Sequence, residues 1–167
     1  MLIIELNTPG GLYDSTRDIV ELILMSEIPI VVYVSPDGAQ AASAGTFITA
    51  SAHIAAMSMT SNIGAASPVS STGETLPDTM DSKAKQDAAA FIRSIAKTRS
   101  RNVNALEETV LISKSYTASE ALEKLNKNEC NLIDIRDANE LQNLGIIENS
   151  INISRGLLEF ATVSYTH

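Results

Sequence analysis

The stretch "IPIVVYVSPDGAQAASAGTFITASA", residues 28–52, contains both kinds of element that decide the fold. Its first part, Ile28–Val34, is a short apolar run dominated by β-branched residues, which predicts a buried strand. The Pro-Asp-Gly sequence at 36–38 ends this strand, because these residues favour turns. Ser43–Ala52 is rich in small residues and predicts a helix.

The same alternation of strand and helix continues on both sides of this stretch. Leu2–Thr8 predicts another buried strand, and Pro9-Gly10-Gly11 turns the chain after it. Apolar residues at helical spacing follow, with Asp14 or Ser15 as the expected N-cap. His53–Met59 predicts a third strand. The order strand–helix–strand–helix–strand implies a parallel sheet with flanking helices, an α/β fold.

The second half of the chain predicts further helices. Ser70–Met80 is polar, contains glycine and proline, and is expected to form a loop. An apolar stripe predicts a long helix over Asp81–Lys97. Asn104 with Glu107 is expected to cap a short helix, and Thr117–Glu120 fits a capping box before another.

Composition and charge exclude several classes of protein. The 167 residues suffice for one domain and a small appendage. A net charge of −8 argues against nucleic-acid binding, which needs a basic surface. Cys130 is the only cysteine, so an internal disulfide and a paired-cysteine metal site are excluded. No apolar run reaches the ~18 residues of a membrane span. Because the chain opens in mid-strand, we expect no signal peptide at its start.

Ser43 is the residue whose surroundings suggest chemistry. It stands among alanines at the start of the predicted helix, where backbone N–H groups are free and the helix dipole favours negative charge. Pro9-Gly10-Gly11 ends a neighbouring parallel strand, at the edge where α/β sheets bind ligands. A serine nucleophile needs a base and such oxyanion donors. The competing interpretation is a helix cap packed against the sheet.

Four ordered segments of the chain resemble the serine protease domain of the NfeD family, the long, membrane-bound, ClpP-class form that is also described as the stomatin operon partner. They are "LNTPGG", "PIVVYVSPDGAQAASAGTFI", "HIAAMSMTSNIGAASPV" and "KAKQDAAAFIRSIAKTRSRN". The resemblance covers about residues 2–125 and implies a ClpP/crotonase-like fold. The sequence departs from the family pattern at Asn7, where related sequences usually have aspartate.

The resemblance also implies peptide hydrolysis by a serine–lysine dyad. Ser43 matches the nucleophile and Lys83 the general base. Gly10 and Gly11 lie in the turn that supplies oxyanion donors, and Ala44 would supply a second N–H. No metal and no cofactor are implied.

The residues alone leave the identity of the base open. A lysine is protonated at neutral pH unless it is desolvated, and Lys85 competes with Lys83 on the predicted helix. His53 is expected to be roughly 15 Å from Ser43 if helix fills the interval. Ser67 occupies the segment in which ClpP has its catalytic histidine, so a Ser-His-Asp triad is unsupported.

The C-terminal part of the chain has a different character. We expect residues 1–128 to form the N-terminally truncated protease domain and residues 129–167 an incomplete appendage. Asn131–Phe160 resembles the opening of a rhodanese-like domain, although "LIDIRDANEL" also resembles the closing segment of the NfeD domain. Cys130 precedes the motif and cannot serve as a rhodanese cysteine, so no sulfurtransferase activity is expected.

The sequence therefore predicts a serine endopeptidase that cleaves apolar peptides, with a stomatin-like membrane protein as the implied substrate. The resemblance further implies a homo-oligomer and a membrane-anchored family whose protease domain lies outside the cytoplasm. One alternative is a catalytically silent module of the same fold that holds an extended peptide. Another is an acyl-CoA enzyme of the crotonase type, which needs no nucleophilic serine.

Overall fold

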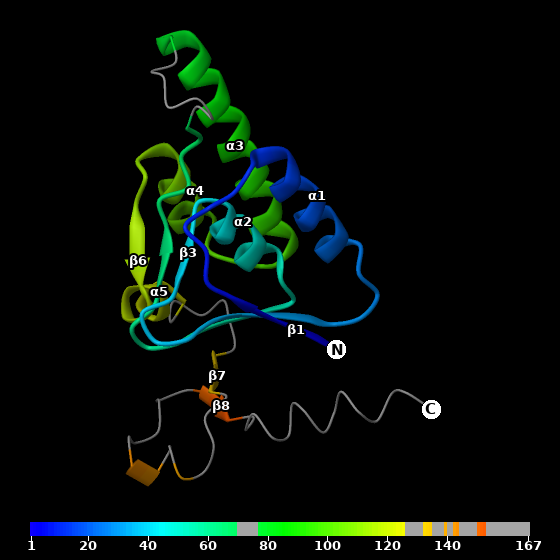
Figure 1. The fold of residues 1–167 in the computed structure, drawn as a ribbon, viewed down its shortest axis with the longest axis vertical. Helices are drawn as coiled ribbons and strands as arrows, with labels where there is room; N and C mark the ends of the chain where they lie inside the picture. Colours follow the sequence, from blue (N-terminus) through cyan, green and yellow to red (C-terminus); the bar gives the residue numbers. More distant parts are fainter. Residues whose placement is uncertain (70–76, 126–131, 135–138, 140–141, 144–149, 153–167) are drawn as a thin grey trace.

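Two small sheets and five helices form the body of the protein in the computed structural model (Figure 1). The structure describes residues 1–69, 77–125, 132–134, 139, 142–143 and 150–152. The first sheet contains β1 (Leu2–Leu6), β2 (Ile30–Val34) and β4 (Ile54–Met57) in the order β1-β2-β4. All its strands are parallel, which confirms the predicted sheet.

The second sheet was not predicted. It contains β3 (Gln40–Ala42), β5 (Asn62–Gly64) and β6 (Ser115–Thr117), with β3 and β5 parallel and β6 antiparallel to β5. Thr8 extends it through a parallel bridge to Ala41. Strands of the first sheet cross the base of Figure 1, whereas those of the second stand upright beside the helices. The chain thus repeats a unit of two strands, one in each sheet, followed by a helix.

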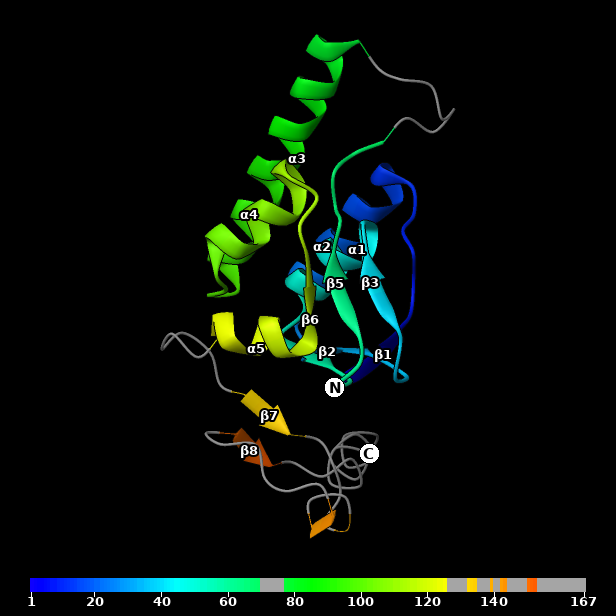
Figure 2. The same ribbon diagram turned by 90° about the vertical axis from the view of Figure 1, so that its left-hand side faces the viewer.

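The helices α1 (Tyr13–Leu24), α2 (Ala44–Ser51) and α3 (Asp78–Thr98) follow these strand pairs. They lie side by side, and their N-terminal ends point the same way (Figures 1 and 2). Every residue of α2 is buried, which explains its lack of a polar face. The main apolar cluster joins α1, α2 and α3 with α4 (Val103–Leu111), and a smaller helix, α5 (Ala118–Leu125), follows β6.

The long helix α3 is only half packed. It begins at Asp78, three residues before the predicted start, and its buried residues begin at Ala88. The turns that precede Ala88 contain no buried residue, and both views show this end of α3 rising beyond the other helices (Figures 1 and 2). The predicted loop therefore contributes its last residues to α3, while residues 70–76 lie outside the described part of the chain.

Two arginines that follow α3 hold the C-terminal end of α2. The Arg101 guanidinium donates to the carbonyls of Ala50 and Ala52 at 2.7 and 2.8 Å, and the Arg99 Nε donates to that of Ser51 at 2.7 Å. These carbonyls have no intrahelical partner, and a cation also suits the negative end of the helix dipole. Burial lowers the pKa of the Arg99 guanidinium. The hydrogen bonds from the two arginines hold the C-terminal end of α2, and Ser43 lies at the opposite, N-terminal end.

The helix caps differ in part from the predictions. Leu12 is the N-cap of α1, so Asp14 and Ser15 lie inside its first turn. The N-cap of α4 is Asn102, whose side chain accepts from the Ala105 N–H at 3.0 Å; the expected Asn104–Glu107 pair is wrong. The Thr117–Glu120 capping box is confirmed, since each side chain accepts from the other residue's backbone N–H.

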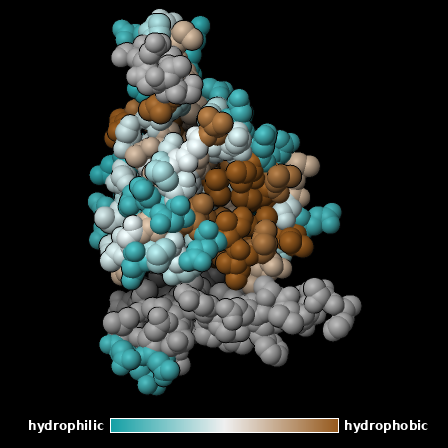
Figure 3. Space-filling view, viewed as in Figure 1, coloured by the Kyte–Doolittle hydropathy of each residue, from teal (hydrophilic) through white to brown (hydrophobic). Residues whose placement is uncertain are grey.

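An apolar surface covers the outer side of α1 and the edge strand β1 (Figure 3). The prediction that β1 is buried is wrong, because Leu2 remains 48% exposed at the edge of the sheet. On α1, Leu22 is 71% exposed, and Met25 just after it is 72% exposed. Patches of this kind commonly mark contact surfaces in proteins.

Little of the C-terminal part is described. Its strands β7 (Leu132–Asp134) and β8 (Ser150–Asn152) pair in parallel. The predicted boundary between residues 128 and 129, Cys130 and His167 all lie outside the described residues. Within the described residues, no helix is long and apolar enough to cross a membrane.

Candidate active site

Ser43 occupies a sharp turn between β3 and α2. Its backbone has φ 50° and ψ −113°, a conformation that non-glycine residues seldom adopt. Strain of this kind persists only where neighbouring structure holds it, and it is concentrated at functional sites. A strained strand-to-helix turn is also the way in which α/β-hydrolases present a nucleophilic serine.

Hydrogen bonds to the Gly64 carbonyl hold this turn in place. The Ser43 N–H donates to that carbonyl at 3.0 Å, as does the fully buried Thr46 hydroxyl, also at 3.0 Å. The Thr46 hydroxyl also lies 2.9 Å from the Ala41 carbonyl. The Thr46 N–H closes the first turn of α2 onto the Ser43 carbonyl at 3.0 Å. The second sheet thus fixes the backbone of Ser43.

The Gly10–Gly11 turn lies directly against Ser43, although the two are far apart in the sequence. A Cβ placed on Gly10 would lie 3.0 Å from the Ser43 Cβ and 3.4 Å from its Oγ, and φ at Gly10 is +146°. Only glycine combines that conformation with so close an approach. A Cβ on Gly11 would lie 3.6 Å from that of Ala44. The structure therefore brings together the predicted nucleophile and the predicted oxyanion turn.

The backbone N–H groups of this turn are not equivalent. The Gly10 N–H donates to the Thr8 hydroxyl at 3.2 Å, and that hydroxyl in turn donates to the Gly10 carbonyl at 2.9 Å. In the described structure the N–H groups of Gly11 and Ala44 make no hydrogen bond. Gly11 and Ala44 therefore retain free N–H donors beside Ser43. Gly10 has no free N–H, but its lack of a side chain leaves room for the Ser43 side chain.

Lys83 is not in hydrogen-bond contact with Ser43. It is exposed on the projecting part of α3, and none of the hydrogen bonds or ion pairs within the described residues involves its amine. It lies one helical turn before Asp87, whose carboxylate meets Tyr13 and Arg17 of α1. Lys83 is thus on the same side of α3 as Asp87, which is the side that contacts α1.

Lys85 is a weaker candidate for the base. Residues two positions apart lie on opposite sides of a helix, so Lys85 faces away from the side that carries Lys83. Its amine is bound to the Asp81 carboxylate at 2.8 Å. The partner of Lys85 and its side of the helix favour Lys83 of the two lysines, and the role of Lys83 as the base stays a prediction.

The other polar residues near the sequence motifs have structural partners. His53 follows the C-terminal end of α2, opposite Ser43, and its Nδ1 accepts from the Ile30 N–H at 3.2 Å. Burial, followed by the nearby Arg99 charge, lowers the pKa of His53. Ser67 donates to the Val110 carbonyl. Asn7, despite the missing carboxylate, caps β3 by accepting from the Gln40 N–H at 3.1 Å.

Comparison with known proteins places this chain in a family. Residues 1–164 match the sequence model of the NfeD1b N-terminal domain. The chain belongs to the NfeD family. This NfeD chain is 39% identical over 145 residues to the membrane-bound protease PH1510 of Pyrococcus horikoshii. The alignment covers 84% of this chain but only 31% of that protein. Over 72 residues it is 40% identical to the membrane protein NfeD1b of Bacillus subtilis, which covers 43% of this chain and 16% of that protein.

Solved structures confirm the ClpP-like fold of this NfeD chain. A mutant of the 1510-N membrane-bound stomatin-specific protease, in complex with a substrate peptide, superposes with a TM-score of 0.69 and 30% identity, covering 97% of this chain and 82% of that one. In that mutant one lysine is replaced by alanine. In another mutant of the same protease, one serine is replaced by alanine. ClpP1 from Listeria monocytogenes shares the fold, with a TM-score of 0.55 and 13% identity over 93% of this chain and 75% of that one.

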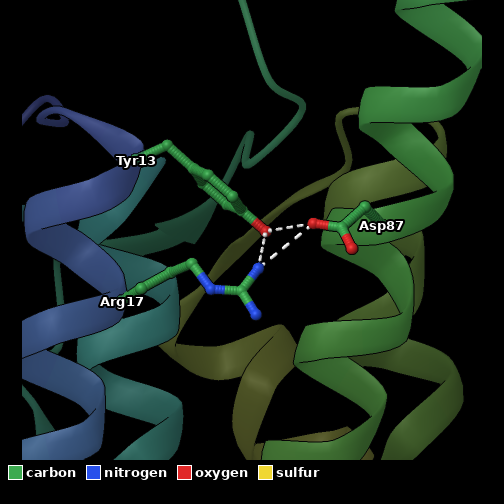
Figure 4. Close-up of polar contacts among 3 residues, drawn as sticks. All are labelled: Tyr13, Arg17 and Asp87. Carbon is green, nitrogen blue, oxygen red and sulfur yellow. Dashed lines mark hydrogen bonds and ion pairs between the residues drawn. The ribbon is translucent and has the colours of Figure 1, made fainter.

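A polar network between α1 and α3 was missed by the sequence analysis (Figure 4). The Asp87 carboxylate accepts from the Tyr13 hydroxyl and from the Arg17 guanidinium, both at 3.1 Å. Burial, then the Asp87 charge, raises the pKa of Tyr13. The residues of this network are far apart in the sequence and belong to no motif, so only the folded structure reveals the network.

In the described part of the chain, no group of acidic, histidine or cysteine side chains could hold a metal.

Proposed function

We propose that this chain is a serine endopeptidase in which Ser43 is the nucleophile and Lys83 the general base. The observation that carries the proposal is the strained turn at Ser43, packed against Gly10, with the unbound N–H groups of Gly11 and Ala44 beside it. Backbone N–H groups aimed at one point are what an oxyanion requires, and fixed donors are a large part of catalysis in acyl transfer. The protease names of the relatives support the same conclusion.

In the proposed reaction, the Ser43 hydroxyl attacks the peptide carbonyl while the neutral Lys83 amine takes its proton. Gly11 and Ala44 donate to the oxyanion of the tetrahedral intermediate. Lys83 then protonates the leaving amine, and an acyl group remains on Ser43. Water, deprotonated by the same amine, releases this acyl group by the reverse sequence.

Formation of the dyad requires the projecting part of α3 to bring Lys83 to Ser43. This part has no fully buried residue in the described structure, so its movement costs little apolar packing. A peptide bound beside Ser43 would exclude water from the amine, and a lysine acts as a base at neutral pH only when it is desolvated. The proposal therefore assigns assembly of the site to the substrate complex.

The proposed substrate is an extended apolar peptide. The residues around Ser43 are small, namely Ala41, Ala42, Ala44 and Gly45, so a peptide backbone can approach the hydroxyl. They offer no charged group for recognition. A structural relative is described as specific for a stomatin homologue, which supports a stomatin-like membrane protein as the natural source of this peptide.

Replacement of the two lysines tests the proposal. Turnover of an apolar fluorogenic peptide should fall about 10²- to 10⁴-fold in Lys83→Ala, the usual contribution of a general base. Lys83→Arg should be equally impaired, because a guanidinium does not release its proton.

Lys85→Ala is the matched control for this test. It removes a lysine of the same helix and should retain turnover within about threefold, since exposed ion pairs contribute little. Equal losses in Lys83→Ala and Lys85→Ala would contradict the assignment of the base. Peptide binding without turnover in the parent chain would instead establish the silent peptide-binding module.

A further inference from the structure

The first two turns of α1 and the middle of α3 are joined by Tyr13, Arg17 and Asp87, which we call the Arg17 network (Figure 4). The Arg17 NH1 lies 3.1 Å from both the Tyr13 hydroxyl and the Asp87 Oδ2. The guanidinium carbon also lies 4.4 Å from the centre of the Phe91 ring. Arg17 therefore contacts α3 through its charge and through its flat face.

The position of this network relates it to the proposed active site. Tyr13, the first residue of α1, follows the Gly10–Gly11 turn after one residue. Asp87 lies one helical turn, about 6 Å, after Lys83. Within the described residues, no hydrogen bond or ion pair joins α3 to another element before this network, and Tyr13 places the network close to the Gly10–Gly11 turn.

The network also determines which charges are available to Lys83. Asp87 and Lys83 are four positions apart, so on a helix they are within reach of one another. Such a pair would stabilise the ammonium form, which cannot accept a proton. In the described structure Asp87 is instead bound to Arg17, and Lys83 is left without a carboxylate partner.

The other charged groups near this part of α3 are exposed or already bound. The carboxylates in the described residues are Asp14 and Asp18 on α1, Asp78 and Asp81 on α3, and Glu107 and Glu108 on α4. Asp14, Asp18 and Asp78 are exposed, and Lys85, Arg93 and Tyr116 bind the others. Helix α2 carries no titratable side chain. Asp87 is therefore the carboxylate most directly placed to hold Lys83.

We infer that Arg17 is a positioning residue for the peptidase: it fixes α3 beside the Gly10–Gly11 turn and keeps the Asp87 carboxylate from Lys83. The inference rests on the proposed function, because it assigns Arg17 a role toward the Lys83 amine. Arg17 itself touches neither Ser43 nor any reacting atom. Its loss should change the pH dependence of turnover as well as the rate.

The test compares the pH profile of kcat in the parent chain with that of Arg17→Met, which keeps an apolar side chain over Phe91. In Arg17→Met the freed Asp87 pairs with Lys83, so more alkaline solution is needed to produce the neutral amine. We expect kcat to fall about tenfold and the acidic limb of the pH profile to move upward by about 0.2 to 0.4 pH unit. KM should stay within about twofold.

Two further variants separate this role from a merely structural one. Adding Asp87→Asn to Arg17→Met should return the acidic limb to its parental position, because the competing carboxylate is gone. Arg93→Met, which breaks the Arg93–Glu107 pair between α3 and α4, should leave the limb unchanged. An unshifted limb in Arg17→Met, or an equal shift in Arg93→Met, would overturn the inference. Absence of Ser43-dependent turnover in the parent chain would instead overturn the proposed function on which it rests.

Discussion

Ser43→Ala should reduce peptide turnover by about 10⁴-fold or more, the largest effect of any single side chain. The substitution removes only a hydroxyl that makes no hydrogen bond in the described structure, so the fold has no reason to change. Alanine also preserves the small-residue character of the turn. A loss of activity with an unchanged circular dichroism spectrum and unfolding midpoint would therefore report chemistry rather than stability.

Ser94→Ala is the matched control for this substitution. Ser94 is exposed on α3, away from the Ser43 turn, and its replacement should leave kcat/KM within about twofold. Turnover that survives in Ser43→Ala, or that disappears equally in Ser94→Ala, would show that another group attacks the peptide. Such a result would also restore the crotonase-type alternative, which uses the fold without a nucleophilic serine.

Gly64→Ala should destabilise the protein more than the addition of a methyl group at any of the other described glycines. A Cβ at this position would lie 2.2 Å from the Lys114 carbonyl oxygen and 2.7 Å from the Ser115 Cα, and φ is +134°. Both obstacles are backbone atoms of β6 and the residue before it, so no side-chain rotation relieves them. We expect a loss of about 3 kcal/mol or more in the free energy of unfolding, measured in urea.

Gly38→Ala separates conformational strain from this collision. Gly38 also has a positive φ, +81°, but a Cβ there meets nothing within 4 Å. Its replacement should cost only about 1 kcal/mol, the penalty of a left-handed conformation. Similar urea midpoints for the two variants would contradict the role assigned to Gly64. Because the Gly64 carbonyl accepts the Ser43 N–H, Gly64→Ala should also lose activity in the fraction that remains folded.

The parallel sheet and its helices could be predicted from the sequence because their signals are local. The apolar runs of β1, β2 and β4 and the stripe of α3 are each visible within one segment. The strands β3, β5 and β6 have three residues each and no apolar pattern. Their extended form depends on partners far away in the chain, which a single segment does not reveal.

The site was predictable in its components and not in its geometry. The small residues around Ser43 and the Gly10–Gly11 turn are visible in the sequence, and the structure places them in contact. The positive φ of Ser43 depends on the Gly64 carbonyl, a long-range contact. Equally, no local pattern indicates that Arg17 would bind Asp87. Residues that act by holding others in place leave no motif.

Covalent labelling by a fluorophosphonate, followed by peptide mass spectrometry, tests the central claim most directly. The reagent reacts with a serine hydroxyl only when a base activates it, and it needs no knowledge of the natural substrate. We predict one adduct, on Ser43, which forms at least 10²-fold more slowly in Lys83→Ala than in the parent chain. An adduct on another serine, or labelling of Ser43 at the same rate in both proteins, would contradict the account.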